Sequence, residues 1–420
     1  MLAFDPFDFQ AVTLANRANR LRCFLKHLPY SSRVQMFVVA GVGARHGKRG
    51  LSHFLEHLLC KKTERFESKE AADLFIEEVG GKVLNLSTYP LHTQVMVEVP
   101  SGSEVQGLEV LSQFIEHPVF EEEIIEKERE VIMNERATRI RRRDGGDIHN
   151  QIYSSVYGEN NPLVWVLSPM AGLGDYSDIQ AITIEDVREH YRRYYHLGNM
   201  ALFIVGNFDH HVLGAAEAMF SRRESEPVPA FENFSESATK PLKKRQDLTD
   251  VYVTGDKASQ HIVRIEALTT KVFPMGALMV LNDMAREALF DLTRRKHGNT
   301  YSPQVRSVIW GDLLEFAAAV ATTGSPELVV DAIAAAFTRV KEDVALFERV
   351  RRKLRYDSLK FDESVGGIMK DAVDDFRSFG RVISLQEYLD ALDRLRLHDV
   401  VAALEVLEEN SVLTIICKTP

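Results

Sequence analysis

The fold of this chain is decided by the stretch Gly50-Leu51-Ser52-His53-Phe54-Leu55-Glu56-His57-Leu58-Leu59. With a helical period, His53 and His57 lie four residues apart and project from one face, about one turn from each other. That spacing allows both imidazoles to bind one metal ion. Glu56 shares the face of His53, three residues further on. The stretch therefore predicts a helix that carries a metal-binding pair with a carboxylate beside it.

The same pattern has a plain alternative. Two His and one Glu occur within five residues by chance, and an amphipathic helix ordinarily carries polar residues on one face. The order His-x-x-Glu-His is nevertheless the inverzincin signature. A catalytic zinc ion takes three protein ligands and leaves its fourth position to water, so a third ligand must come from elsewhere in the chain. Glu56 would then be free to accept a proton from that water.

A second helix is predicted over residues 121–135, Glu-Glu-Glu-Ile-Ile-Glu-Lys-Glu-Arg-Glu-Val-Ile-Met-Asn-Glu. Two pairs of apolar residues recur seven apart and mark a buried stripe: Ile124 and Ile125, then Val131 and Ile132. Glu128 and Glu135 are also seven apart, so they lie on one side of the helix. Most carboxylates of such a helix form a solvated face, and the residues alone leave open which of them reaches a metal.

These two motifs resemble the pitrilysin/insulinase family of zinc peptidases, which includes the mitochondrial processing peptidases. The resemblance is strongest to two-domain bacterial members that are similar to those processing peptidases. It lies in Gly-Leu-Ser-His-Phe-Leu-Glu-His-Leu-Leu and in the later Glu-Arg-Glu-Val-Ile-Met-Asn-Glu. The separation of 78 residues between His57 and Glu135 is similar to that in the family.

The resemblance implies a role for each matched residue. His53, His57 and Glu135 would bind one Zn²⁺ ion per chain. Glu56 would be the general base, and Glu128 a carboxylate that supports the site from behind the ligands.

Composition narrows the class of protein. A length of 420 residues favours two domains, and 45% hydrophobic with 27% charged residues is typical of a soluble globular protein. The net charge of −10 argues against nucleic acid as a partner. No apolar run approaches the ~20 residues of a membrane span. With an acidic N-terminus and three scattered cysteines, we expect a cytoplasmic protein without a disulfide framework.

Two other residues near the motifs could be ligands. Cys60 follows His57 by three residues on the same predicted helix, and His92 lies near a predicted turn. For Cys60 we favour a small apolar packing residue. For His92 we favour a solvated or packing residue.

The chain is predicted to be α+β, a duplicated unit that forms two related α/β-sandwich domains. Each half finishes with a helix and then an apolar strand, at residues 183–209 and again at residues 386–416. The segment 221–247 is rich in Pro, Ser, Glu and Lys and is the best linker. We therefore expect a metal-bearing domain over 1–220 and a related noncatalytic domain over 248–420. The resemblance implies that the two domains form half of a clamshell chamber.

Two segments would contact substrate if the resemblance holds. Asn85 lies in a stretch that resembles the family's edge strand, which pairs with the backbone of a bound peptide. Leu86 departs from the family pattern, and one residue is inserted between Gly81 and Asn85.

In the second half, Leu-Thr-Arg-Arg-Lys-His-Gly-Asn-Thr-Tyr-Ser resembles a segment whose Arg and Tyr reach the active site. Arg294 and Tyr301 match those two positions and would stabilise the oxyanion. The alternative is a basic turn before a strand.

The sequence thus predicts a zinc-dependent endopeptidase that hydrolyses unfolded peptides or small polypeptides in an enclosed chamber, with water activated by the metal as nucleophile. The rival is a noncatalytic peptide-binding or scaffold subunit of the same fold. Because the family chamber takes four domains and this chain supplies two, we expect a homodimer or a heterodimer with a related subunit.

Overall fold

The computed structural model describes residues 8–16, 19–142, 148–158, 161–167, 171–220, 239–241, 249–254, 261–295, 300, 302–359 and 364–419. The chain forms two compact units, each a mixed sheet covered by helices, so the predicted α+β class is confirmed. The first unit comprises Met1–Thr138, Pro169–Phe231 and Asp362–Ser384. The second comprises Arg139–Ser168, Glu232–Phe361 and Leu385–Pro420.

The first unit is built on a six-stranded sheet with the order β1-β2-β6-β3-β5-β4. The strands are β1 (Gln10–Asn16), β2 (Asn19–His27), β3 (Arg33–Ala40), β4 (Lys82–Thr88), β5 (Thr93–Pro100) and β6 (Met200–Gly206). β6 is central, and all its residues are buried, which agrees with its unbroken apolar sequence. β4 forms one edge.

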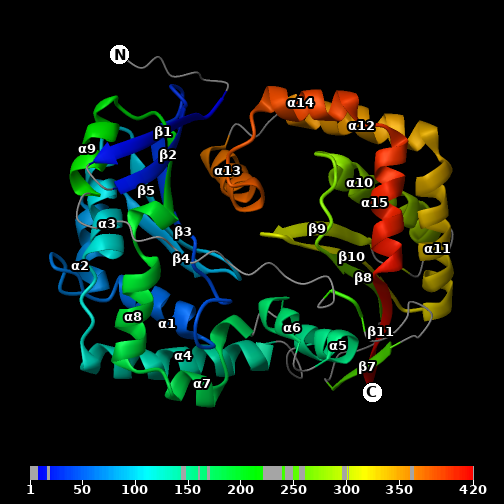
Figure 1. Ribbon diagram of the computed structural model, residues 1–420, viewed down its shortest axis with the longest axis horizontal. Coiled ribbons are helices and arrows are strands. Elements are labelled where there is room, and N and C mark those ends of the chain that lie inside the picture. Colours follow the sequence, from blue (N-terminus) through cyan, green and yellow to red (C-terminus); the bar gives the residue numbers. More distant parts are fainter. Residues whose placement is uncertain are drawn as a thin grey trace. The chain divides into compact units, whose positions relative to one another are not determined.

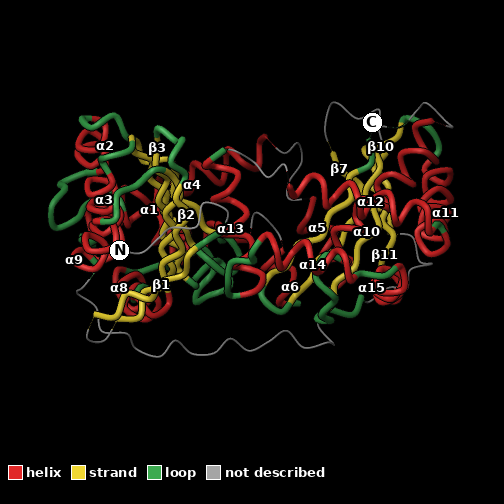
Figure 2. The backbone as a smooth tube through the Cα atoms, turned by 90° about the horizontal axis from the view of Figure 1, so that it is seen from above, coloured by secondary structure: helices red, strands yellow, loops and turns green. Residues whose placement is uncertain are grey.

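Helices cover both faces of this sheet, as Figure 2 shows for α3 and α13. The helices of the unit are α1 (Leu51–Leu59), α2 (Lys69–Glu77), α3 (Glu104–Glu116), α4 (Glu122–Arg142), α7 (Tyr176–Gln180), α8 (Ile184–Tyr194), α9 (His211–Met219) and α13 (Val365–Phe379). Side chains of β3 alternate between the faces, as a strand requires. Met36 and Val38 join the larger core with α1 and α3, whereas Phe37 and Val39 pack with α13.

The second unit repeats the strand arrangement. Its five-stranded sheet has the order β7-β11-β8-β10-β9, with β7 (Thr249–Thr254), β8 (His261–Thr269), β9 (Gln304–Trp310), β10 (Leu313–Thr322) and β11 (Ser411–Thr419). The series β2-β6-β3-β5-β4 and β7-β11-β8-β10-β9 match pair by pair: the first pair is parallel in each sheet and the others are antiparallel. The predicted duplication is therefore visible in the topology.

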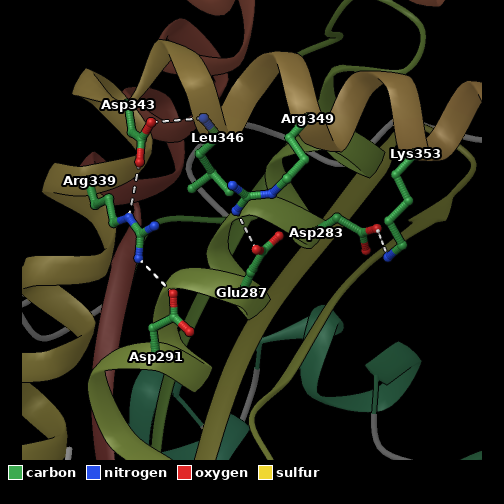
Figure 3. Close-up of polar contacts among 8 residues, drawn as sticks. All are labelled: Asp283, Glu287, Asp291, Arg339, Asp343, Leu346, Arg349 and Lys353. Carbon is green, nitrogen blue, oxygen red and sulfur yellow. Dashed lines mark hydrogen bonds and ion pairs between the residues drawn. The ribbon is translucent and has the colours of Figure 1, made fainter. Parts of the chain in front are cut away.

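Most helices of the second unit pack on one face of its sheet. They are α10 (Ala277–Phe290), α11 (Pro326–Glu342), α12 (Val344–Leu359), α14 (Leu385–Arg394) and α15 (Leu397–Glu409). Acidic residues spaced four apart, two on α10 and Asp291 directly after its end, meet cations of α11 and α12 (Figure 3). Arg339 Nη1 lies 3.0 Å from Asp291 Oδ2, and Lys353 Nζ lies 3.2 Å from Asp283 Oδ2.

The other face of each sheet is covered by helices from the opposite half of the sequence (Figure 1). α5 (Ile148–Tyr157) and α6 (Pro162–Leu167) pack on the second sheet, against Leu268, Leu313 and Val412. α13 packs on the first sheet. The predicted domain bounds of 1–220 and 248–420 do not allow for this exchange. Each unit consists of three separate segments, so one boundary in the sequence cannot separate the two units. Most of the predicted linker, 221–238 and 242–247, lies outside the described residues.

None of the described helices is both long and apolar enough to cross a lipid bilayer.

Gly206, at the end of β6, provides a test of this packing. Its φ is +140°, and a Cβ there would lie 2.2 Å from the backbone oxygen of Arg33 on β3. We expect Gly206→Ala to lower the free energy of unfolding by about 2–3 kcal/mol, measured by urea unfolding. In the control Gly214→Ala, on α9, the new Cβ meets no atom within 4 Å, so stability should stay equal or rise by up to about 1 kcal/mol. Equal unfolding midpoints for the two variants would contradict the prediction.

Candidate metal centre

The first histidine-bearing helix forms as predicted. α1 runs from Leu51 to Leu59 and follows Gly50, which adopts a left-handed conformation with φ 77°. Phe54, Leu55 and Leu58 point into the core of the first unit. His53 and Glu56 are also buried, so the helix sits inside the unit and holds its polar residues in a fixed place.

Three side chains converge between α1 and α4. His53 Nε2 lies 3.6 Å from Glu135 Oε2, and His57 Nε2 lies 3.4 Å from the same oxygen. The two imidazole rings are 4.6 Å apart between centroids. Two imidazoles and a carboxylate, with one donor atom each within 4.8 Å of the others, could hold a metal ion. Among the described residues they form the one such cluster of His, Cys, Asp and Glu.

The distances match what a small tetrahedral cation requires. Bonds of about 2.0–2.1 Å to nitrogen and oxygen place neighbouring ligand atoms about 3.3 Å apart. The separations of 3.4 and 3.6 Å from Glu135 are close to that value. Both histidine–carboxylate separations therefore fit such an ion, and all three donor atoms lie within 4.8 Å of one another.

The other nitrogen of His57 is fixed by a carboxylate. His57 Nδ1 lies 2.7 Å from Glu128 Oε1, and Lys61 Nζ lies 2.8 Å from Glu128 Oε2. Glu128 is buried, so this contact holds the imidazole with Nε2 turned to Glu135, an arrangement typical of metal-binding histidines.

The charges of these groups are strongly coupled. Burial disfavours the imidazolium of His57, but its hydrogen bonds with Glu128 and Glu135 outweigh burial and raise its pKa to about 9. Burial also opposes the charged form of Glu128, and the hydrogen bonds from His57 and Lys61 outweigh it and lower the pKa of that carboxyl. Because a metal ion binds the deprotonated imidazole, a cation at the cluster would compete with a proton for His57.

Glu56 lies in a different environment from the other carboxylates. Burial raises its pKa above the ordinary value, while the charge of His57 and hydrogen bonds from Thr88 oppose that rise. A carboxyl whose pKa is raised by burial is better suited to accept and return protons than an exposed carboxyl. Thr88 is the last residue of β4, so the edge strand contacts this carboxylate.

Asn85 lies on the edge strand, as predicted. Its neighbour Leu84 is the extra residue: the register of β4 against β5 shifts between Val83 and Asn85, which forms a β-bulge opposite Met96. The bulge accounts for the insertion noted in the sequence. The exposed Asn85 side chain donates to Ser87 Oγ at 2.8 Å, and its contact with a substrate stays a prediction.

Cys60 and His92 have packing roles. Cys60 is buried, burial raises its thiol pKa to about 12, and its Sγ contacts the His57 carbonyl at 3.6 Å. His92 is 4% exposed and its ring stacks on Tyr89. Neither belongs to the metal-binding cluster.

The substrate-contact pair predicted in the second half is not described. The backbone of Arg294 belongs to a π-helical turn, Asp291–Arg295, but its side chain lies outside the described residues. Tyr301 lies outside them altogether.

Sequence reasoning missed Lys61 and the role of Thr88. Lys61 follows His57 by four residues, so a helical period extended past the end of the motif would have placed it beside His57. Thr88 could not have been identified from spacing, because its contact with Glu56 depends on how the edge strand packs against α1.

Two further histidines support the glycine-rich loop before α1. Ser52 Oγ donates to the Gly43 carbonyl at 2.6 Å and lies 2.9 Å from His190 Nε2 on α8. His46 Nδ1 accepts from the Gly43 amide at 2.9 Å. Burial lowers the pKa of His46 to about 3 and that of His190 to about 4. Both rings are therefore neutral in the folded protein.

This neutrality predicts a loss of stability in acid. Below a pKa of about 6.5 the unfolded chain binds a proton at each histidine, whereas folded His190 does so only near pH 4. The free energy of unfolding should therefore fall as the pH drops from about 6.5, by up to about 1.4 kcal/mol per pH unit for each histidine. Chemical unfolding between pH 7 and 5 should give a shallower slope for His190→Gln than for the wild type. Parallel slopes would show that His190 does not titrate in this way.

The chain matches known domains over most of its length. The insulinase (peptidase family M16) domain matches residues 22–161, and the peptidase M16 inactive domain matches residues 181–354. An uncharacterised zinc protease of Rickettsia felis is 26% identical over 399 residues, which cover 91% of this chain and 92% of that protein.

A second relative and one solved structure are similar to the same chain. The probable mitochondrial-processing peptidase subunit beta of Arabidopsis thaliana is 27% identical over 43% of this chain and 32% of that protein. The crystal structure of a protease from Helicobacter pylori shares the fold with a TM-score of 0.77 at 19% identity, over 98% of this chain and 99% of that one. With both M16 domains matched in order and this fold around the two motifs, the chain belongs to the insulinase family of peptidases, family M16.

Proposed function

We propose that this protein is a zinc-dependent endopeptidase that cleaves unfolded peptides. The observation that carries the proposal is the convergence of His53, His57 and Glu135 next to the buried Glu56. Glu135 Oε2 lies 3.6 Å from His53 Nε2 and 3.4 Å from His57 Nε2. The relative from Rickettsia felis is named a zinc protease, which supports the same choice of metal. Two imidazoles and one carboxylate are also a ligand set of known catalytic zinc sites.

Each residue has a distinct task in this proposal. His53, His57 and Glu135 would hold the ion, and Glu128 keeps His57 in the orientation that the ion needs. When bound, zinc would lower the pKa of a water molecule and polarise the scissile carbonyl. Glu56 takes the proton of the attacking water and later delivers it to the leaving amine. Thr88 holds the Glu56 carboxylate in place.

The substrate in this proposal is an extended backbone. β4 is an edge strand of the sheet and ends at Thr88, beside Glu56. An edge strand offers unpaired backbone groups to another chain and asks little of its sequence. A peptide paired there would lead its backbone towards the metal ligands. Arg294 and Tyr301 keep the roles in oxyanion binding that the resemblance implies.

Zinc affinity tests the role of Glu128. Glu128→Gln removes the charge that fixes His57 Nδ1, so we expect the zinc dissociation constant to rise about 10–100-fold, measured by competition with a chromophoric chelator. Glu130→Gln is the matched control because Glu130 lies on the same helix but is exposed. If both variants bind zinc like the wild type, Glu128 does not support the site.

Cleavage of a quenched, unstructured peptide tests the proposed function. Glu56→Gln should lower kcat by about 10²–10⁴-fold while the protein keeps one zinc ion per chain, measured by elemental analysis. Glu130→Gln again serves as the control and should cleave normally.

The rival function makes a different prediction in the same experiment. A noncatalytic peptide-binding or scaffold subunit would retain stoichiometric zinc but show no cleavage that depends on Glu56. That result would overturn the peptidase proposal. A purified protein that cannot retain a divalent ion would overturn it as well.

A further inference from the structure

The edge strand and its neighbour are joined by a short hairpin that touches the catalytic carboxylate. Thr88 ends β4 and pairs with Thr93, the first residue of β5. Thr88 Oγ1 lies 3.5 Å from the carbonyl oxygen of Ser52 on α1, and Thr88 acts on the Glu56 carboxyl by lowering its pKa. Thr93 Oγ1 donates to the Val42 carbonyl at 2.8 Å. The place of Glu56 therefore depends on where this hairpin sits.

The hairpin turn is bound to the loop that precedes α1. The amides of Ala44 and Arg45 donate to the carbonyls of Tyr89 and Pro90 at 2.8 and 2.9 Å. The two backbones approach so closely that a Cβ on Gly43 would lie 2.2 Å from the Tyr89 oxygen. The loop thus holds one side of the turn, and a shift of the turn would be transmitted to Thr88 in the same hairpin.

A stack of three side chains covers the tip of this turn. The Tyr89 and His92 rings are nearly parallel, with centroids 4.4 Å apart and an angle of 8°. The guanidinium of Arg377 lies over the Tyr89 ring, 5.0 Å from its centroid. This distance is within the range of a cation–π contact. His92 is buried at 4% exposure, and its Nε2 makes no hydrogen bond in the described part of the chain. Ring stacking and the 2.8 Å hydrogen bond from the Tyr89 amide to the His92 carbonyl therefore hold it.

Arg377 lies on α13, which belongs to the second half of the sequence and packs on the first sheet. Apolar residues at helical spacing, including Ile368, Met369 and Val373, fix α13 to that sheet. Asp374 Oδ1 lies 2.8 Å from Arg377 Nη1 and orients the guanidinium. Arg377 is therefore held by a rigid element and is not a loosely attached surface cation.

We infer that Arg377 is a positioning residue for the reaction: by stacking on Tyr89 it fixes the Thr88–Thr93 hairpin, and through Thr88 it fixes Glu56. This inference rests on the proposed function. It is independent of metal binding, because the stack contacts neither His53, His57 nor Glu135. Through Arg377, the second half of the sequence thus helps to set the position of Glu56, although the proposed metal ligands all lie in the first half.

The test compares Arg377→Ala with Lys370→Ala in the full-length, zinc-loaded protein. Lys370 also pairs with Asp374, at 2.8 Å, but contacts no ring of the stack. Because displacement of a catalytic group by about 1 Å can cost about 100-fold in rate, we expect Arg377→Ala to lower kcat at least about tenfold. KM for the quenched peptide and the zinc dissociation constant should change by less than about twofold. Lys370→Ala should match the wild type.

Two ring variants separate positioning from general stability. Tyr89→Phe keeps the stacked ring and should keep kcat, whereas Tyr89→Ala removes it and should reproduce the loss seen in Arg377→Ala. If Arg377→Ala and Tyr89→Ala lower only the melting temperature and leave kcat unchanged, the inference is wrong. An equal loss of kcat in Lys370→Ala would also overturn it.

Amide hydrogen exchange of residues 88–93 gives a readout that does not depend on activity. Arg377→Ala should speed exchange of the hairpin, and Lys370→Ala should not. If the wild type cleaves no peptide, the proposed function fails, and exchange alone decides whether Arg377 holds the hairpin. Unchanged exchange in Arg377→Ala would then overturn the inference, and faster exchange would uphold that contact.

Discussion

Both sheets of this protein have two apolar faces, and each face must be removed from water. In the first unit, residues such as Phe24, Phe37 and Phe203 form a second core that lies opposite the larger one. The chain buries that core under α13, and it buries the corresponding face of the second sheet under α5 and α6. At about 25 cal/mol for each Å² of apolar surface removed from water, leaving either face open would cost more than a domain of this size can spare. The reciprocal exchange of helices is thus a condition for both units to be stable.

The candidate metal-binding cluster reflects a second constraint, the burial of charge. α1 is almost wholly buried, so its polar residues can only be accommodated if they pair with something. His57 pairs with Glu128, and Glu128 in turn with Lys61. His53 and His57 both face Glu135. The same burial that makes these contacts necessary also raises the pKa of Glu56 above its ordinary value.

Much of this structure could be predicted from local patterns in the sequence. The helical period of residues 50–59 and 121–135, and the repeated order of helix and strand in the two halves, predicted the elements and the duplicated α+β class. Glu135 was identified from a resemblance rather than from spacing, because nothing local separates it from the other carboxylates of its helix. What the sequence could not show were contacts between distant segments. The exchange of α13 with α5 and α6, the contact of Thr88 with Glu56 and the stack under Arg377 each join residues whose proximity depends on tertiary packing. The bulge at Leu84 was predicted only in part. The sequence showed that one residue is inserted, but not that the insertion shifts the register of β4 against β5.

The exchanged helices also impose an order on synthesis. β6 ends at Gly206, whereas α13 does not begin until Val365. While the ribosome adds the intervening residues, the aromatic surface formed by Phe24, Phe37 and Phe203 has no helix to lie against it. A nascent chain in this state exposes an apolar sheet face to solvent or to a chaperone. Burial of this face of the first sheet can therefore be completed only after the residues of α13 have been synthesised.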